Sequence, residues 1–450
     1  MTRFFCLRGV GGVLSLAVVL FSLSACSSGG WFGDDDEKPL PGKRISVLEL
    51  QKKLEPDSAA LNEQGYTPPS SWHNEFWPQA GGYPTHAMQN LDLNAGPLKE
   101  LWRADIGRGA TKALPLASEP IVAEGKIFAL NTESELHALN ATTGQKLWHV
   151  KVRPAYESDT VIGGGVAYSR GKLFVSTGYD YLVAISPDGG KALWSARLPA
   201  ASRAAPTVVD DRVFVTLMDN HLVVLSADDG HTLWDFSGIS ETAGLVGAAS
   251  PAVSAEVVVP AFSSGEIFAL RVENGTVAWG DNLSTFRRAG GLSSIADIRG
   301  LPVIDKDLVL AVSYGDNMAA IDLRTGSRLW QREIGSQETP WVAGDHVFVL
   351  SNANQLVALR RDTGVIHWIT DLPRFEKPED RSGPIFWTGP VLAGGRLIMA
   401  SSTGAVTEVN VGDGKVLRKW DAGRPVSLPL VVAGGMLYML ADDGELLAFK

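Results

Sequence analysis

Hydrophobic and polar residues alternate in short runs through most of the chain beyond residue 100. The runs 126–130, 136–140 and 146–150 carry apolar side chains that alternate with polar or small ones, and polar turns separate the runs. A period of two predicts strands, because successive side chains of a strand point to opposite faces of a sheet. The Thr143-Gly144 turn between the last two runs predicts a hairpin, since glycine adopts the positive φ that a tight connection needs.

These strands belong to a repeat that is marked by a tryptophan four residues after a turn glycine. A seventh copy has Arg418 in place of tryptophan, and we expect Trp420, two residues later, to compensate for it. A strand at Trp102 lacks the turn. Successive gaps from Trp102 to Arg418 are 46, 46, 40, 45, 51, 38 and 50 residues. Strands with a period of about 45 residues are typical of a β-propeller rather than a helical solenoid. The six complete copies end at Trp148, Trp194, Trp234, Trp279, Trp330 and Trp368.

The two ends of the repeat array complement each other. Residues 425–450 supply three strands and no fourth, whereas the strand at Trp102 has no three strands before it. The sequence therefore predicts an all-β, eight-bladed propeller over residues 71–450, with four-stranded antiparallel blades closed by pairing of the N- and C-terminal strands. We interpret the seven tryptophans as structural, because an indole that buries about 200 Å² fills the gap that widens between blades away from the axis.

Residues 1–25 have the features of a secretory signal peptide. Arg3 and Arg8 precede an apolar run that is shorter than the roughly 20 residues of a spanning helix. The run ends in Leu23-Ser24-Ala25-Cys26, which resembles the lipobox of bacterial lipoproteins and makes Cys26 the predicted lipid-attachment residue. Residues 26–70 are predicted to form a lipidated, largely flexible tether, within which residues 45–54 have the pattern of a short helix or strand.

The charge balance argues against nucleic acid as a partner. The net charge is −10, and removal of the predicted signal with its two arginines leaves −12. No dense cluster of lysine and arginine provides the basic face that phosphate binding requires. Attachment to a membrane is therefore expected to come from lipid at Cys26, and the serine that follows it favours the outer membrane.

No combination of side chains indicates a catalytic or metal site. The eight histidines are scattered and lack a ligand spacing such as His-Glu-x-x-His. The stretch Gly163-Gly164-Gly165 lacks the lysine and the helix of a phosphate loop, and is interpreted as a connection between blades. The sequence predicts no catalytic residue, no cofactor and no metal ion. The histidines are His73, His86, His137, His149, His221, His231, His346 and His367.

With these motifs the chain resembles the PQQ-like propeller superfamily, and its lipobox, length and blade number together resemble the BamB family of outer-membrane assembly lipoproteins. The resemblance covers about residues 70–450 and includes the segment Trp77–Gly82 before the first blade. It implies a non-catalytic scaffold, monomeric within a hetero-complex and lipid-anchored at the periplasmic face of the outer membrane. The implied partners are the POTRA domains of BamA, other components of the assembly machinery and nascent outer-membrane proteins.

The resemblance also implies a partner face on loops of two neighbouring central blades, residues 242–247 and 293–299. Leu245 and Asp297 match the family's interface leucine and first acidic residue. Val246 stands where relatives have arginine, and Arg299 stands where they have a second acid. Two other hypotheses stay open: a dehydrogenase that uses pyrroloquinoline quinone, which shares the blade motif, and a periplasmic propeller that binds a small ligand.

Overall fold

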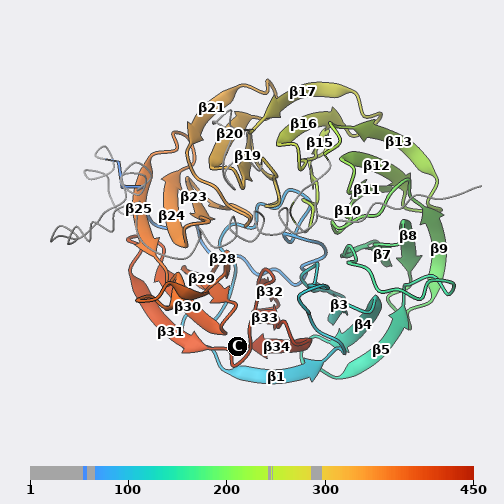
Figure 1. Cartoon of the computed structure of the whole chain (residues 1–450), viewed down its shortest axis with the longest axis horizontal. Helices are drawn as coiled ribbons and strands as arrows, with labels where there is room; N and C mark the ends of the chain where they lie inside the picture. Colours follow the sequence, from blue (N-terminus) through green and yellow to red (C-terminus); the bar gives the residue numbers. More distant parts are fainter. Residues whose placement is uncertain (1–53, 58–65, 242–244, 246, 285–295) are drawn as a thin grey trace, which may run out of the picture. The chain divides into compact units, whose positions relative to one another are not determined.

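Eight β-sheets of four antiparallel strands surround a common axis in the computed structural model (Figure 1). The structure describes residues 54–57, 66–241, 245, 247–284 and 296–450. The predicted all-β propeller with eight blades is confirmed. In seven blades the strands follow chain order from the axis outwards, so that short hairpins join them.

The strands of the seven contiguous blades have the following bounds. Blade 1 consists of β2 (Ile121–Ala123), β3 (Lys126–Leu130), β4 (Glu135–Asn140) and β5 (Lys146–Lys151), and blade 2 of β6 (Val166–Ser169), β7 (Lys172–Ser176), β8 (Tyr181–Ile185) and β9 (Ala192–Arg197). Blade 3 consists of β10 (Thr207–Val209), β11 (Arg212–Thr216), β12 (His221–Ser226) and β13 (Thr232–Ser237), and blade 4 of β14 (Ala252–Val253), β15 (Val257–Val259), β16 (Glu266–Arg271) and β17 (Val277–Asn282). Blade 5 consists of β18 (Val303–Asp305), β19 (Leu308–Ser313), β20 (Asn317–Asp322) and β21 (Arg328–Arg332), and blade 6 of β22 (Trp341–Ala343), β23 (His346–Leu350), β24 (Gln355–Arg360) and β25 (Ile366–Asp371). Blade 7 consists of β28 (Trp387–Ala393), β29 (Arg396–Ser401), β30 (Ala405–Asn410) and β31 (Val416–Asp421).

The eighth blade joins the two ends of the repeat array. Its three inner strands are β32 (Val431–Ala433), β33 (Met436–Leu440) and β34 (Glu445–Phe449), and its outer strand is β1 (Glu100–Asp105). Trp102 of β1 lies opposite Ala448 of β34, and the backbones of Lys99 and Lys450 exchange two hydrogen bonds of 2.9 Å. The predicted closure by N- and C-terminal strands is confirmed.

The hydrophobic core lies between neighbouring sheets rather than in one central cluster. Phe174 of blade 2, for example, is buried in the same cluster as Val213 and Val223 of blade 3. The alternation in the sequence follows from this arrangement, because each sheet is covered on both faces by the adjacent blades.

Each repeat tryptophan lies on an outer strand and contacts the turn of the next blade. The indole Nε1–H of Trp102 donates to the carbonyl of Ala141 over 3.2 Å, and a Cβ at Gly144 would lie 2.5 Å from the same ring. Gly144 also has a φ of 71°, so both the turn and the indole require glycine. The same contact joins Trp148 to Gly190, Trp194 to Gly230, Trp234 to Gly275, Trp279 to Gly326, Trp330 to Gly364 and Trp368 to Gly414.

Arg418 interrupts this series at the place where the ring closes. Blade 8 has no turn between its third and fourth strands, since one ends the chain and the other begins at Glu100. In the other blades the residue opposite the repeat tryptophan is alanine or valine, whereas Arg418 lies opposite Glu408. An ion pair therefore replaces the contact between indole and glycine.

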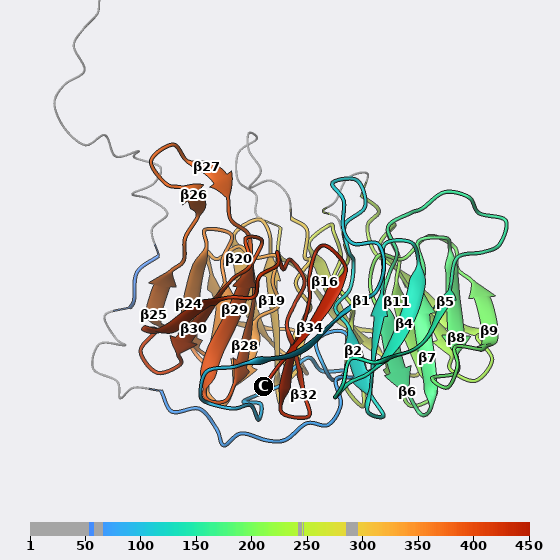
Figure 2. The same cartoon turned by 90° about the horizontal axis from the view of Figure 1, so that it is seen from below.

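A segment of residues 71–95, the inner strap, runs once around the axis along the innermost strands. Hydrogen bonds join it to each blade in turn. They are backbone bonds in six blades, for example Trp77 to Val122 of blade 1 and Leu91 to Leu392 of blade 7, and involve a side chain in blades 3 and 6. Trp77 is only 2% exposed. The strap lies on one face of the ring, at the bottom of Figure 2. Its other partners are Gly434 of blade 8, Tyr168 of blade 2, Val208 of blade 3, Val253 of blade 4, Ile304 of blade 5 and Trp341 of blade 6.

The opposite face, which we call the loop face, carries the connections between blades. It also carries an additional hairpin of β26 (Phe375–Lys377) and β27 (Ser382–Pro384), which projects at the top of Figure 2. The described residues of the predicted partner loops, 245, 247 and 296–299, belong to this face, because they lie in the connections from blade 3 to blade 4 and from blade 4 to blade 5. Residues 242–244, 246 and 293–295 of these loops lie outside the described residues. No helix of membrane-spanning length and hydropathy occurs in the part of the chain that the structure describes.

Part of the predicted tether lies against blade 6. Asp57 exchanges two hydrogen bonds with the backbone of Ile366 and forms an ion pair of 3.0 Å with Arg332. The hydroxyl of Tyr66 donates to the carbonyl of Ala343 over 2.7 Å. The predicted signal peptide, Cys26 and the remainder of the tether up to residue 53 lie outside the described residues.

Candidate functional site

The loop face brings together Leu245, from the connection between blades 3 and 4, and Asp297, from the connection between blades 4 and 5. The carboxylate Oδ2 of Asp297 accepts a hydrogen bond of 2.5 Å from the backbone N–H of Leu245. Both residues line a cavity of about 280 Å³, the interloop cavity, together with Met218, Phe262 and other residues of blades 3 and 4. Two loops that are distant in sequence thus form one wall.

Asp297 is 3% exposed, so its carboxylate faces the protein rather than solvent. Burial raises the pKa of this carboxyl, while the hydrogen bond from Leu245 and the charge of Arg299 act in the opposite direction. The carboxylate thus binds the backbone N–H of Leu245. Leu245 itself is half-buried, and Val246 lies outside the described residues.

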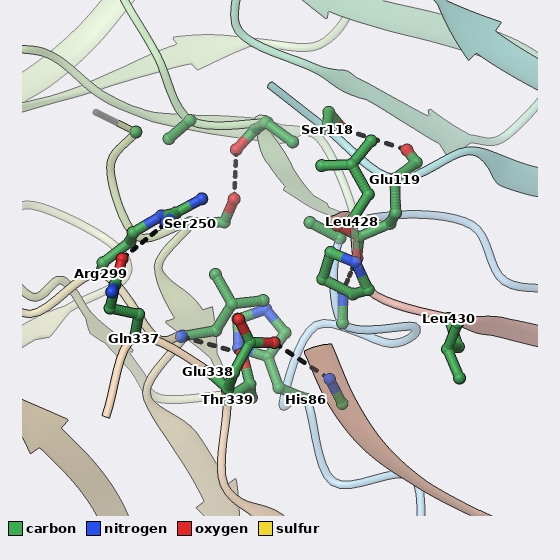
Figure 3. A pocket seen from close by; sticks show the side chains of 18 of the residues that line it. His86, Ser118, Glu119, Ser250, Arg299, Gln337, Glu338, Thr339, Leu428 and Leu430 are labelled. Carbon is green, nitrogen blue, oxygen red and sulfur yellow. Dashed lines mark hydrogen bonds between the residues drawn. The ribbon is translucent and has the colours of Figure 1, made fainter. Parts of the chain in front are cut away.

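Arg299 is turned away from this pair. Its Nη1 donates to Oε1 of Gln337 over 2.8 Å, and the side chain lines a second cavity on the propeller axis. We call this space of about 110 Å³ the axial cavity (Figure 3). Sequence reasoning placed Arg299 on the partner face, and the structure places it where the loop face meets the axis.

The walls of the axial cavity come from the segments that lead into the innermost strands, and the strap forms its floor through Trp77, Gly81 and His86. Charged side chains lie at several points of the wall. Figure 3 shows Arg299 on one side, Glu119 on the other and Glu338 between them. Arg203, which precedes blade 3, also lines the cavity.

Hydrogen bonds hold the two glutamates in place. Oε1 of Glu119 accepts from the backbone N–H of Gly81 over 2.7 Å. Oε2 of Glu338 accepts from Oγ1 of Thr388 over 2.8 Å and from the backbone N–H of Gly389 over 3.1 Å. Burial raises the pKa of both carboxyls, and the charge of Glu338 adds to the effect at Glu119.

Sequence reasoning did not identify Glu119, Glu338 or Arg203. Each is isolated among unremarkable residues in the chain, and the ring closure alone brings them around one axis. A signal was nevertheless present: all three lie one to three residues before the proline that leads into a blade, at Pro120, Pro340 and Pro206.

The amino-acid sequence matches the family model for the outer membrane protein assembly factor BamB over residues 90–161 and 132–370. The chain belongs to the BamB family. It is 25% identical over 354 residues to BamB of Salmonella typhimurium strain LT2, which covers 77% of this chain and 88% of the relative. It is 26% identical over 349 residues to BamB of Escherichia coli strain K12, which covers 76% of this chain and 86% of the relative.

Solved structures show the same fold. The crystal structure of BamB from Moraxella catarrhalis superimposes with a TM-score of 0.66 at 22% identity, covering 79% of this chain and all of that one. A quinohemoprotein alcohol dehydrogenase from Comamonas testosteroni gives a TM-score of 0.64 at 13% identity, covering 84% of this chain and 81% of that one. BamB and the quinoproteins therefore share a propeller, and fold alone does not distinguish them.

The residues on the axis do not fit a quinone cofactor with calcium. No group of three or more histidine, cysteine, aspartate or glutamate side chains is placed to hold a metal ion anywhere in the described residues. The axial cavity of about 110 Å³ is also smaller than the roughly 300–1,000 Å³ of sites for larger ligands. We therefore derive no redox step for this BamB-family chain.

Proposed function

We propose that the protein is a non-catalytic scaffold of the outer-membrane β-barrel assembly machinery. A lipid at Cys26 holds it at the periplasmic face of the outer membrane, and the loop face binds the POTRA domains of BamA. Membership of the BamB family supports this role. The observation that carries it is the ordered contact between Leu245 and Asp297 beside an open cavity on the loop face.

The arrangement has the features of a protein interface. A half-buried leucine beside a cavity of about 280 Å³ provides an apolar anchor, and burial of an anchor in a pocket contributes most of the binding energy in many interfaces. The ring is rigid because strand pairing and the strap connect all blades. Little conformational entropy is therefore lost when the loop face binds.

Binding of the full-length protein in detergent to purified BamA POTRA domains tests this proposal. Leu245→Asp places a charge at the anchor and is expected to weaken binding by about tenfold or more. Leu193→Asp is the matched control, since Leu193 is 47% exposed on the outer strand β9, away from the partner loops. Equal affinities of Leu245→Asp and Leu193→Asp for BamA would remove this loop from the interface.

A further inference from the structure

The axial cavity carries four charged side chains that the proposed scaffold role does not use: Glu119, Glu338, Arg203 and Arg299. The residues at the equivalent places of the other blades show whether the fold itself requires a charge there. Six blades have a proline at the same place, directly before the last paired residues of the innermost strand, whereas Pro429 of blade 8 lies one residue earlier. The three residues before the proline face the axis in several of these blades. If a charge were needed for folding at this place, it would recur around the ring.

The four charges do not recur. Glu119 directly precedes its proline, whereas the other five blades have Ala205, Ser250, Leu301, Thr339 and Gly389 there. Glu338 is two residues before its proline, where the others have Ser118, Ala204, Ala249, Gly300 and Thr388. Arg203 and Arg299 are three residues before theirs, where the others have Ala117, Ala248, Gln337 and Trp387. Small or neutral residues therefore satisfy the fold at the equivalent places of the other blades, so a charge there is not a general requirement of the repeat.

The opposite charges also do not neutralise each other directly. Arg299 donates to Gln337, and Arg203 forms no hydrogen bond or ion pair with any described residue. Glu119 precedes blade 1 and Arg299 precedes blade 5, so they face each other across the eight-bladed ring. Arg203 precedes blade 3 and Glu338 precedes blade 6. The cavity thus has separate cationic and anionic sides.

We propose that the axial cavity binds a small zwitterion, whose carboxylate is held by Arg203 and Arg299 and whose ammonium group is held by Glu119 and Glu338. Guanidinium groups match carboxylates in geometry. An ammonium group supplies the ion pair that neither glutamate forms within the described part of the chain, where the charge of Arg299 acts on Glu338 without a direct contact. The axial cavity of about 110 Å³ is smaller than the cavity of about 150 Å³ that accommodates benzene, so a zwitterion bound there must be as compact as a small amino acid. The proposal does not depend on BamA binding.

The surroundings of the four charges favour such a ligand. Trp77, Trp341, Leu301 and Leu428 contribute apolar surface to the cavity, and a low local dielectric strengthens each charged hydrogen bond. The strap closes the far side, whereas two further cavities that share residues with the axial cavity extend towards the loop face. One of them shares Arg299 and Glu338 with the axial cavity, and the other shares Arg203. A ligand would enter from the loop face.

Isothermal titration of the full-length protein in detergent with L-serine tests the proposal. Glycerate, in which a hydroxyl replaces the ammonium group, and ethanolamine, which lacks the carboxylate, are the matched ligand controls. We expect L-serine to bind about tenfold or more tightly than either. Arg203→Gln and Glu338→Gln are each expected to weaken serine binding by about tenfold or more, since each removes a charged hydrogen bond.

Arg324→Gln is the control variant, because Arg324 is exposed in the turn between β20 and β21 on the strap side of the ring. Its serine affinity should equal that of the unmodified protein. Circular dichroism of each variant checks that the ring is intact. The proposal is overturned if L-serine does not bind, if the three compounds bind equally, or if folded Arg203→Gln and Glu338→Gln proteins retain full affinity.

Discussion

Glu408 replaces the alanine or valine found opposite the repeat tryptophan in other blades, and it is completely buried. Its carboxylate accepts hydrogen bonds from Nε of Arg396 at 2.7 Å, Nη1 of Arg418 at 2.8 Å and Nε1 of Trp420 at 2.9 Å. Arg418 also donates to the carbonyl of Gly96 beside β1. Three donors compensate the desolvation of this carboxylate at the seam of the ring.

Glu408→Ala is therefore expected to lower the free energy of unfolding by about 3–5 kcal/mol, because it leaves the buried guanidinium of Arg396 without its partner. Urea denaturation checks this value. Asp413→Ala, at an exposed turn of the same blade, should cost less than about 1 kcal/mol. Similar losses for the two variants would contradict a role of Glu408 in closure.

The role of Trp420 could not be predicted from the spacing of residues within one repeat. Its position two residues after Arg418 suggested that it takes the place of the missing tryptophan. Instead its Nε1–H donates to Glu408, and its ring lies 5.0 Å from that of Phe449 in blade 8. The spacing within one repeat predicted the six outer-strand tryptophans from Trp148 to Trp368. It does not predict a substitution that depends on contacts with the neighbouring blade.

His86 makes the stability of the ring depend on pH. It is buried in the strap, donates from Nδ1 to the carbonyl of Pro302 over 2.7 Å, and has its pKa lowered to about 4 by burial. The unfolded chain binds a proton at this residue below about pH 6.5, but the folded protein does so only near pH 4. The contribution of His86 is thus present above pH 6.5 and is lost as the pH falls to about 4.

Over this range the free energy of unfolding is expected to fall by about 3 kcal/mol more in the unmodified protein than in His86→Asn. Asparagine keeps a donor for Pro302 and tolerates the φ of 61° at this position. Chemical denaturation at several pH values between 4 and 7 measures the difference. Parallel pH profiles of the two proteins would show that His86 does not titrate as described.

At the scale of elements, Asp297 connects the two predicted partner loops. Asp297→Ala removes the acceptor for the backbone N–H of Leu245, so faster amide exchange at Leu245 is expected in the free protein. Asp297→Asn retains an oxygen acceptor and should exchange at an intermediate rate. Unchanged exchange in Asp297→Ala would indicate that other contacts order the loop.

The repeat elements were predictable from sequence, because period-two patterns and turn glycines report on local packing that recurs in every blade. The strap was not predictable, because residues 71–95 follow the shape of the ring and their hydrophobic residues show no regular spacing. The hairpin of β26 and β27 was missed for a related reason: it occurs in one blade only. The placement of Leu245 beside Asp297 followed from family resemblance, not from any local pattern.

At the scale of the whole molecule, the two faces of the ring present different surfaces for contact with a partner. The strap covers one side, whereas the loop face carries the inter-blade connections, the hairpin and the three cavities. Ring closure gives both faces their rigidity. The axial residues likewise became visible only at this scale, because Glu119 and Arg299 are 180 residues apart in the chain.

Co-purification of tagged protein with BamA from solubilised outer membrane tests the scaffold role most directly. We expect BamA to be recovered with the unmodified protein and with Leu193→Asp, and to be largely lost with Leu245→Asp. Recovery of the same amount of BamA with all three proteins would contradict the assignment of the loop face, and absence of BamA from all of them would contradict the scaffold role itself.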